Sequence, residues 1–210
     1  MSISFLGDTR VVAWRLDEAS RMLELCREAG VPADDLLEFP VKRQREKAAE
    51  RLLLCHALGQ SVKLAYNEQG APFVEGIDVN ISISHTQRLV VLAVDLERTI
   101  GVDAEQADRH QVLRVRDKFL NASEKRFIAP DDLAAHVIAW TAKESIIKAE
   151  RNSALDWTDG ITLDPFSLDG LEGGEVTFTA RCGDVRYSLV SRLVEGHYIT
   201  LAVETVGLGQ

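Results

Sequence analysis

The sequence has few cysteines, few prolines, few aromatic residues and no long apolar segment. Of its 210 residues, 3 are cysteine and 5 are proline, and aromatic residues make up 6%. Cys26, Cys55 and Cys182 are odd in number and far apart, which excludes a disulfide scaffold and favours a reducing environment. The longest aliphatic run, residues 89–94, is far too short to cross a membrane. These absences predict a cytoplasmic protein with no membrane partner.

Acidic residues outnumber basic ones, since 33 Asp and Glu stand against 24 Lys and Arg, and the formal net charge is −9. A phosphate backbone needs a cationic surface, so this excess argues against nucleic acid as a partner. Two local runs are nevertheless basic, at residues 42–51 and 114–126. The simplest interpretation of each run is a solvated helix face. The 46% of hydrophobic and 27% of charged residues are typical of an ordinary globular protein.

Hydrophobic periodicity predicts a mixture of helices and strands. Helical spacing occurs at residues 17–29, 42–58, 111–120, 123–128 and 131–150, and strand-like patterns at 78–86, 89–94, 99–105, 175–182, 185–192 and 198–204. Each half of the chain has a long helix followed by paired strands, and LAVD at 92–95 is echoed by LAVE at 201–204. We therefore predict an α+β fold of two similar halves, residues 1–100 and 101–210. Each half would be a long helix packed on a small antiparallel sheet.

Three acidic residues form the most informative chemical pattern. Asp103 and Glu105 lie two apart in a predicted strand, so their side chains project from one face, although such alternation usually marks a half-exposed edge. Glu144 lies between Trp140 and Lys148 in a predicted helix, and the spacing of four places all three on one stripe. A surface ion pair is the simplest interpretation of Glu144 and Lys148. The tryptophan that begins the stripe instead favours partial burial.

If the strand and the helix converge, the three carboxylates need a cation. Carboxylates about 5 Å apart repel by about 3 kcal/mol per pair at an effective dielectric of about 20, so three pairs cost about 10 kcal/mol. That cost is comparable with the stability of a whole domain, so such a cluster takes up protons or binds an ion. Carboxylate ligands without His or Cys suit Mg²⁺, and Mg²⁺ readily shares phosphate oxygens with a substrate.

A third pattern, Ser-Ile-Ser-His-Thr at residues 82–86, ends a predicted strand. Its hydroxyl groups and imidazole can donate hydrogen bonds to anionic oxygens. A single histidine such as His85 is more often structural than catalytic. Upstream, Gly70-Ala71-Pro72 is typical of a simple turn.

Taken in order, these segments resemble the 4′-phosphopantetheinyl transferase family, in its larger single-chain type with two pseudo-symmetric halves. The family patterns are Gly-Lys-Pro, Asn/Ser-x-Ser-His-Ser, Gly-x-Asp-x-Glu, Phe-x-x-x-Glu and Trp-x-x-Lys-Glu-Ser/Ala-x-x-Lys. The similar segments here are residues 70–72, 82–86, 101–105, 119–124 and 140–148, although four residues rather than three separate Phe119 from Glu124. The resemblance covers residues 40–150 most strongly. It implies one compact pseudo-dimeric unit with pseudo-twofold symmetry, which completes its own site and is therefore expected to be a monomer.

The resemblance implies transfer of the 4′-phosphopantetheine group from coenzyme A to a serine of an apo acyl or peptidyl carrier protein, with release of 3′,5′-ADP. It implies Mg²⁺, with Mn²⁺ as a possible substitute, bound by Asp103, Glu105 and Glu144. Glu144 and Lys148 are the implied catalytic residues. The implied contacts to coenzyme A are Arg51, Arg43, Gly70, Pro72, Ser84, His85 and Lys148, with Lys42 and Arg45 as further candidates for its phosphate.

Two positions depart from the family pattern, because Ala71 replaces the usual lysine and Thr86 replaces the commoner serine. Carrier proteins of this kind are acidic, so an enzyme of negative net charge needs a local basic surface for docking. We expect that surface at Arg114, Arg116 and Phe119.

Two other functions stay open. The same acids could serve another Mg²⁺-dependent phosphoryl or nucleotidyl enzyme, which would not require coenzyme A. Alternatively, the chain could be a non-catalytic module that binds coenzyme A or a carrier. The sequence does not identify the carrier, which could belong to fatty acid, polyketide or non-ribosomal peptide synthesis.

Overall fold

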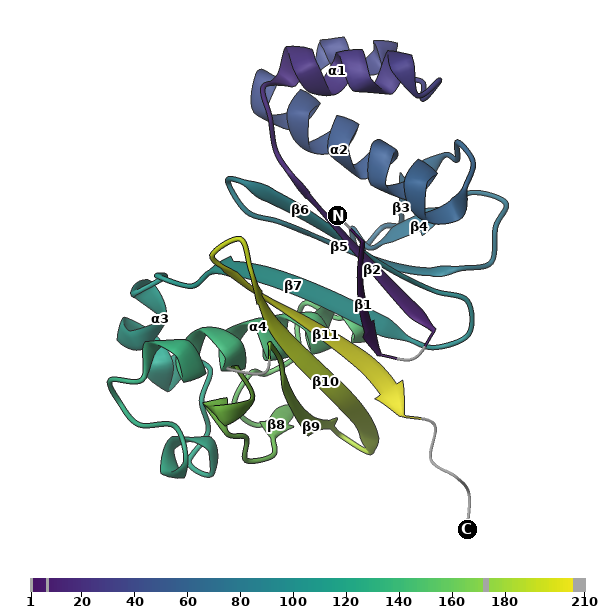
Figure 1. The fold of residues 1–210 in the computed structure, drawn as a ribbon. Helices are drawn as coiled ribbons and strands as arrows, with labels where there is room; N and C mark the ends of the chain where they lie inside the picture. The colour runs from purple at the N-terminus through teal and green to yellow at the C-terminus, as the bar shows by residue number, and fades with distance from the viewer. Residues whose placement is uncertain (1, 7, 172–173, 206–210) are drawn as a thin grey trace. The chain divides into compact units, whose positions relative to one another are not determined.

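The computed structural model describes residues 2–6, 8–171 and 174–205, and the chain divides into two compact units, residues 1–97 and 98–210. Each unit contains one helix of 18 residues packed against an antiparallel sheet, which confirms the predicted α+β class (Figure 1). Among the helices of the described residues, none combines the length and the apolar character that crossing a membrane requires.

The first unit is built on a four-stranded antiparallel sheet. In spatial order its strands are β1 (Ser2–Leu6), β2 (Thr9–Arg15), β6 (Leu89–Asp95) and β5 (Asn80–His85). The other elements are α1 (Ala19–Glu28), the short helix η1 (Asp34–Glu38), α2 (Val41–Leu58) and the hairpin of β3 (Leu64–Tyr66) and β4 (Pro72–Val74). Helix α2 packs on β2 and β6, and α1 packs on α2. The core of this unit therefore lies between the sheet and α2, with a second layer beneath α1.

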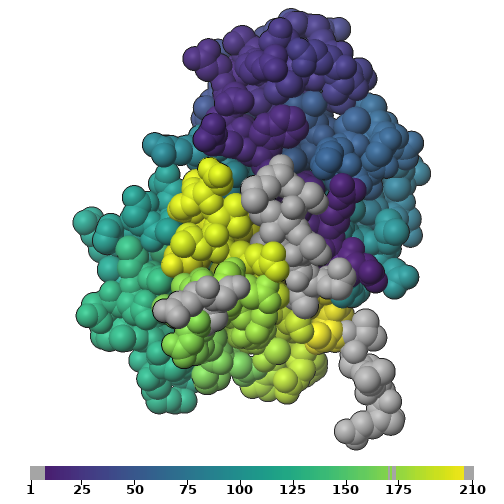
Figure 2. Space-filling view, viewed as in Figure 1, coloured from purple at the N-terminus to yellow at the C-terminus, as the bar shows by residue number. Residues whose placement is uncertain are grey.

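Helix α1 is a clear example of how apolar spacing positions an element. Met22, Leu23 and Cys26 are buried on the side that packs on α2, because residues three and four apart share a helix face. Arg21 and Glu24 are exposed and form an ion pair. In Figure 2 the residues of α1 lie within the purple part of the surface.

The second unit is built on a five-stranded antiparallel sheet. In spatial order its strands are β7 (Ile100–Gln106), β11 (His197–Thr205), β10 (Val185–Val194), β9 (Val176–Cys182) and β8 (Ile161–Leu163). Its long helix is α4 (Leu133–Glu150), and its short helices are α3 (Gln111–Arg114), η2 (Arg116–Lys118), η3 (Glu124–Arg126) and η4 (Leu168–Leu171). Helix α4 packs mainly on β7 and β11 (Figure 1), and the core lies between the helix and the sheet.

Gly101 allows α4 to approach β7 closely. A Cβ atom at this position would lie 1.8 Å from the carbonyl oxygen of Ser145 and 2.8 Å from the amide nitrogen of Ala149. Both of these atoms belong to the helix backbone, which cannot rotate away as a side chain can. Glycine is therefore required here by the helix–strand contact.

We expect Gly101→Ala to lower the free energy of unfolding by about 3 kcal/mol, because the added methyl forces α4 and β7 apart. Urea denaturation of the purified variant measures this loss. Ser153→Thr, which also adds one methyl but at an exposed position, serves as the matched control and should stay within about 0.5 kcal/mol of wild type. Equal unfolding midpoints for the two variants would show that the contact tolerates a side chain.

Candidate active site

The acidic residues of β7 lie on the strand face that α4 covers. Gly101 meets the α4 backbone on this face, and Asp103 and Glu105 share it because strand residues two apart point the same way. Asp103 is buried, at 5% exposure, and Glu105 is half-buried. The cross-strand neighbour of Asp103 is Thr200 of β11, which is bonded to Thr141 of α4 at 2.6 Å. Both predicted strand acids, Asp103 and Glu105, therefore point towards α4.

The predicted stripe on α4 is present in the structure. Trp140, Glu144 and Lys148 are half-buried, whereas most of the residues between them are fully buried. Lys148 bridges directly to β7, because its Nζ atom donates to Oδ1 of Asp103 at 2.7 Å and to the carbonyl oxygen of Val102 at 3.1 Å. The stripe and the strand acids thus form one cluster.

Glu105 has a cationic partner that the sequence interpretation did not include. The guanidinium of Arg109 donates to Oε1 of Glu105, and it also lies over the ring of Trp140, 5.1 Å from the ring centroid. Arg109 stands four residues after Glu105, beyond the end of β7. Only the fold of the following turn brings the two together, so the linear pattern of acids gave no sign of this pair.

The charge environment of Glu144 places it in the same cluster. Burial raises the pKa of Glu144, and the nearby negative charge of Asp103 raises it further. The positive charges of Lys148 and Arg109 lower this pKa and partly offset the increase. Glu144 is therefore a carboxylate under like-charge repulsion, with a stronger affinity for a proton or a cation than an isolated glutamate has.

The donor set of this cluster fits Mg²⁺ in its chemistry. Within residues 2–6, 8–171 and 174–205, no three His, Cys, Asp or Glu side chains are already gathered as a metal-binding group. Asp103 instead holds the ammonium of Lys148, and Glu105 holds the guanidinium of Arg109. All three acids, Asp103, Glu105 and Glu144, offer hard oxygen ligands. They are the residues that would hold the ion if Lys148 and Arg109 moved away from the carboxylates.

A second buried ion pair supports the cluster from the other side of α4. Lys143 and Glu124 are both 0% exposed, and Nζ of Lys143 donates to Oε2 of Glu124 at 2.8 Å. Lys143 also donates to the carbonyl oxygens of Trp157 and Ile161, and Glu124 accepts from the amide of Leu163 at 2.8 Å. These bonds tie the loop before α4 and strand β8 to the helix.

The sequence interpretation missed the structural role of Lys143, although a signal was present. Ala139, Ile146 and Ile147 lie three or four positions from Lys143 and are buried. A helix places them on the same face. A lysine on an apolar helix face predicts a buried partner, and Glu124 is that partner.

In the first unit, Glu50 of α2 connects three of the segments that the sequence singled out. Its carboxylate is only 3% exposed, and it is bonded to Nε2 of His85 at 2.7 Å and accepts from the hydroxyl of Tyr66 at 2.8 Å. Burial raises the pKa of Glu50, but the hydrogen bonds and charges of its partners, His85 first, outweigh burial and lower the pKa overall. His85 is thus bonded to a buried carboxylate. Its sequence context had shown only a single histidine with no partner.

The predicted turn at Gly70 and Pro72 is the tip of the β3–β4 hairpin. Gly70 has a φ of 80°, and Pro72 begins β4 opposite Tyr66. Through the bond between Tyr66 and Glu50, this hairpin is connected to the end of β5, where Ser84 is buried. The hairpin that carries residues 70–72 and the segment at 82–86 are therefore both bonded to Glu50, through Tyr66 and His85.

The basic residues at α2 do not form a single group. Arg51 makes a bidentate pair with Asp35 at 2.6 and 2.7 Å, and it also donates to the carbonyl oxygen of Pro32. Arg43 lies 3.7 Å from a carboxylate oxygen of Glu46. The structure thus directs Arg51 to an internal acid.

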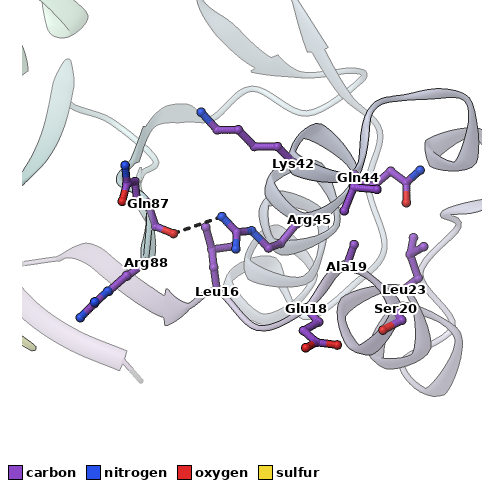
Figure 3. Close-up of a pocket in the computed structure, with 11 residues that line it drawn as sticks. Leu16, Glu18, Ala19, Ser20, Leu23, Lys42, Gln44, Arg45, Gln87 and Arg88 are labelled. Atoms are coloured by element: carbon purple, nitrogen blue, oxygen red, sulfur yellow. Dashed lines mark hydrogen bonds between the residues drawn. The ribbon is translucent and has the colours of Figure 1, made fainter.

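Lys42 and Arg45 instead border a cavity of about 1050 Å³ between the start of α1, the start of α2 and the turn after β5. Glu18 contributes an acid to its lining (Figure 3). Arg45 is held in place by donating to the carbonyl oxygen of Gln87 at 3.1 Å.

The predicted docking residues differ in their accessibility. Arg114 is exposed and Arg116 is half-buried. Phe119 is only 1% exposed, and its ring packs edge-on against Trp140 at 5.2 Å. Phe119 therefore belongs to the core that positions α4, and the exposed charge in this region comes from Arg114 and its neighbours.

Residues 99–202 match the sequence model of the 4′-phosphopantetheinyl transferase superfamily. This region contains β7, α4 and most of β11, and therefore the whole cluster of Asp103, Glu105, Glu144 and Lys148. The segments at residues 70–72 and 82–86 lie outside it. No curated protein matches the sequence.

Proposed function

We propose that this protein transfers 4′-phosphopantetheine from coenzyme A to a serine of an apo carrier protein, because residues 99–202 match the sequence model of the 4′-phosphopantetheinyl transferase superfamily. The observation that supports the proposal best is the cluster on β7 and α4. Lys148 of α4 is bonded there to Asp103 of β7, and the charges of Asp103, Lys148 and Arg109 act on Glu144. Interacting charged groups in such a half-buried position are typical of functional sites.

In the transfer step, the serine hydroxyl oxygen attacks the phosphorus that carries the pantetheine arm. A bond forms between this oxygen and phosphorus, and the bond from phosphorus to the bridging oxygen of 3′,5′-ADP breaks, with its electron pair leaving on the ADP. Glu144 accepts the serine proton as the general base. A bound Mg²⁺ would neutralise charge on the pyrophosphate.

Lys148 orients the reactants through charge. The Nζ atom of Lys148 lies 2.7 Å from Oδ1 of Asp103, and the Lys148 side chain is 28% exposed. The ammonium can therefore contact an anionic oxygen of the substrate while it stays close to the strand acids. A cation in this position stabilises the negative charge that develops on the leaving group. Phosphoryl transfer depends mainly on such alignment and charge neutralisation.

Apart from Lys148, the residues that we propose to contact coenzyme A belong to the first unit. His85 presents a partly exposed imidazole bonded to Glu50, and Lys42 and Arg45 supply cations beside the cavity of Figure 3. Arg43, Arg51, Gly70, Pro72 and Ser84 complete the proposed set. Arg51 would bind the substrate only by sharing or leaving Asp35.

The experiment that tests this function incubates the protein with coenzyme A, Mg²⁺ and a panel of apo acyl and peptidyl carriers. Mass spectrometry then measures each carrier. We expect one carrier class to gain a single phosphopantetheine group, with no gain when its acceptor serine is replaced by alanine. Failure to modify any carrier would contradict the proposal, and turnover of other phosphate substrates without coenzyme A would favour a different phosphoryl enzyme.

We also propose that the carrier docks beside α3. Reversing the charge of an exposed docking residue weakens attraction to an acidic partner. For Arg114→Glu we expect the KM for the carrier to rise about tenfold while kcat stays near the wild-type value. Arg181→Glu, an equal charge change on an exposed residue of β9, is the matched control. An unchanged KM for Arg114→Glu would remove α3 from the docking surface.

A further inference from the structure

We propose that Arg109 is an internal counter-ion of Glu105 that a divalent cation displaces, and that the ring of Trp140 senses this displacement. The inference rests on the proposed metal site. It assigns a positioning role to a residue outside the predicted set of ligands.

The backbone after β7 holds Arg109 in place. The amide of Ala107 donates to the carbonyl oxygen of Gly196 at 2.9 Å, and the amide of Arg109 donates to that of Gln106 at 3.1 Å. This turn directs the guanidinium back onto Glu105, and the side chains of the pair are 29% and 21% exposed. The ion pair is therefore a built contact at the edge of the cluster.

Trp140 gives the guanidinium a second point of attachment. Arg109 lies 5.1 Å from the Trp140 ring centroid, within the range of a cation–π interaction. The ring itself is fixed by Phe119 at 5.2 Å and by Trp157 at 4.6 Å. A change in the position of Arg109 therefore alters the environment of an indole that is packed against two aromatic rings.

Both charge repulsion and free space favour the replacement of Arg109 by a divalent cation at Glu105. A divalent cation bound by Glu105 would repel a guanidinium on the same carboxylate, and a partly exposed ion pair is weak enough to be broken. A cavity of about 310 Å³ adjoins the pair and is lined by Arg109, Val112, Trp140 and Trp157, among others. The side chain can thus leave Glu105 and stay beside Trp140.

The direct test is the affinity of the full chain for Mn²⁺ in the absence of coenzyme A, measured by calorimetry or by the electron paramagnetic resonance of free Mn²⁺. We expect Arg109→Gln to bind Mn²⁺ about three- to tenfold more tightly than wild type, because no resident cation has to be displaced. Arg109→Lys, which keeps the charge, should stay close to wild type. Arg126→Gln, an equal charge change on an exposed residue, should not alter the affinity.

A second measurement reports the displacement itself. In a Trp14→Phe background, titration with Mg²⁺ should change the fluorescence of the indole cluster in the otherwise wild-type protein, and this change should be lost in Arg109→Gln. Equal or weaker Mn²⁺ binding by Arg109→Gln would overturn the inference, since Arg109 would then be a structural residue or a support for the ligand Glu105. Absence of any Mn²⁺ binding by the wild type would also overturn it, and carrier modification in the mass assay would show that the proposed transfer function nevertheless stands.

Discussion

Glu144→Gln is expected to lower kcat for carrier modification by about 10³-fold or more, with the fold intact. Glutamine has nearly the same size as glutamate but cannot accept the serine proton, and the loss of a general base alone costs about 10²–10⁴-fold in rate. The charge that helps to hold a divalent ion is lost as well. Initial rates of mass gain on the carrier measure the effect.

The same substitution should leave thermal stability equal to wild type or slightly higher. The pKa of Glu144 is raised in the folded protein, so its charged form is disfavoured by folding, and the neutral amide removes this cost above the usual pKa of a glutamate. A loss of activity without a loss of stability separates a catalytic role from a structural one. Asp131→Asn, which removes an exposed acid just before α4, is the control and should change neither property. Wild-type turnover by Glu144→Gln would refute the assignment of Glu144 as the base.

Lys143→Met is expected to lower the free energy of unfolding by about 3–5 kcal/mol, because it leaves Glu124 as an uncompensated charge in the core. Glu124 also holds the amides of Asn121 and Leu163, so it cannot turn towards solvent without breaking these bonds. Urea denaturation, monitored by circular dichroism, gives the free energy directly.

Two further variants make this prediction specific. Lys125→Met breaks the exposed pair with Asp117 and should cost less than about 1 kcal/mol. The double variant Lys143→Met/Glu124→Gln should lose less stability than the sum of the losses of the two single variants, because it leaves no unpaired charge in the core. Similar unfolding midpoints for Lys143→Met and Lys125→Met would mean that the buried pair contributes little.

The elements with strong periodicity could be predicted from the sequence. The long helices, β5 to β7 and β9 to β11 are found close to their predicted positions. Strands β1 and β2 were not predicted. Val11, Val12 and Ala13 in β2 are buried in succession, and a strand buried on both faces lacks the alternation that identifies strands.

The region before α4 was predicted as two helices and is instead a series of short turns. Helix α3 ends at Arg114, and residues 124–126 form a single 3-10 turn. Here the side chain of Asn121 accepts from the amides of Ser123 and Glu124, and Glu124 is drawn into the core by Lys143. Such tertiary and local side-chain bonds override helical spacing, and periodicity does not contain them.

In the candidate site, too, some features could be predicted from the sequence and others could not. The face shared by Asp103 and Glu105, and the stripe of Glu144 and Lys148, follow from the two- and four-residue spacings alone. The partners that hold them do not. Arg109 reaches Glu105 through the geometry of a turn, which no spacing rule specifies.

Contacts between residues far apart along the chain could not be predicted from sequence patterns either. Glu50 meets His85 across 35 positions, and Arg51 meets Asp35 across 16. Each of these contacts depends on how a helix packs against another segment.

The most direct measurement is the anomalous scattering of Mn²⁺ in crystals of the protein grown with coenzyme A. We expect one strong peak within coordination distance of carboxylate oxygens of Asp103, Glu105 and Glu144, with the pyrophosphate of coenzyme A as a further ligand. Well-ordered coenzyme A with no Mn²⁺ peak among these three residues, or with the peak at other side chains, would contradict the proposed metal-assisted transfer.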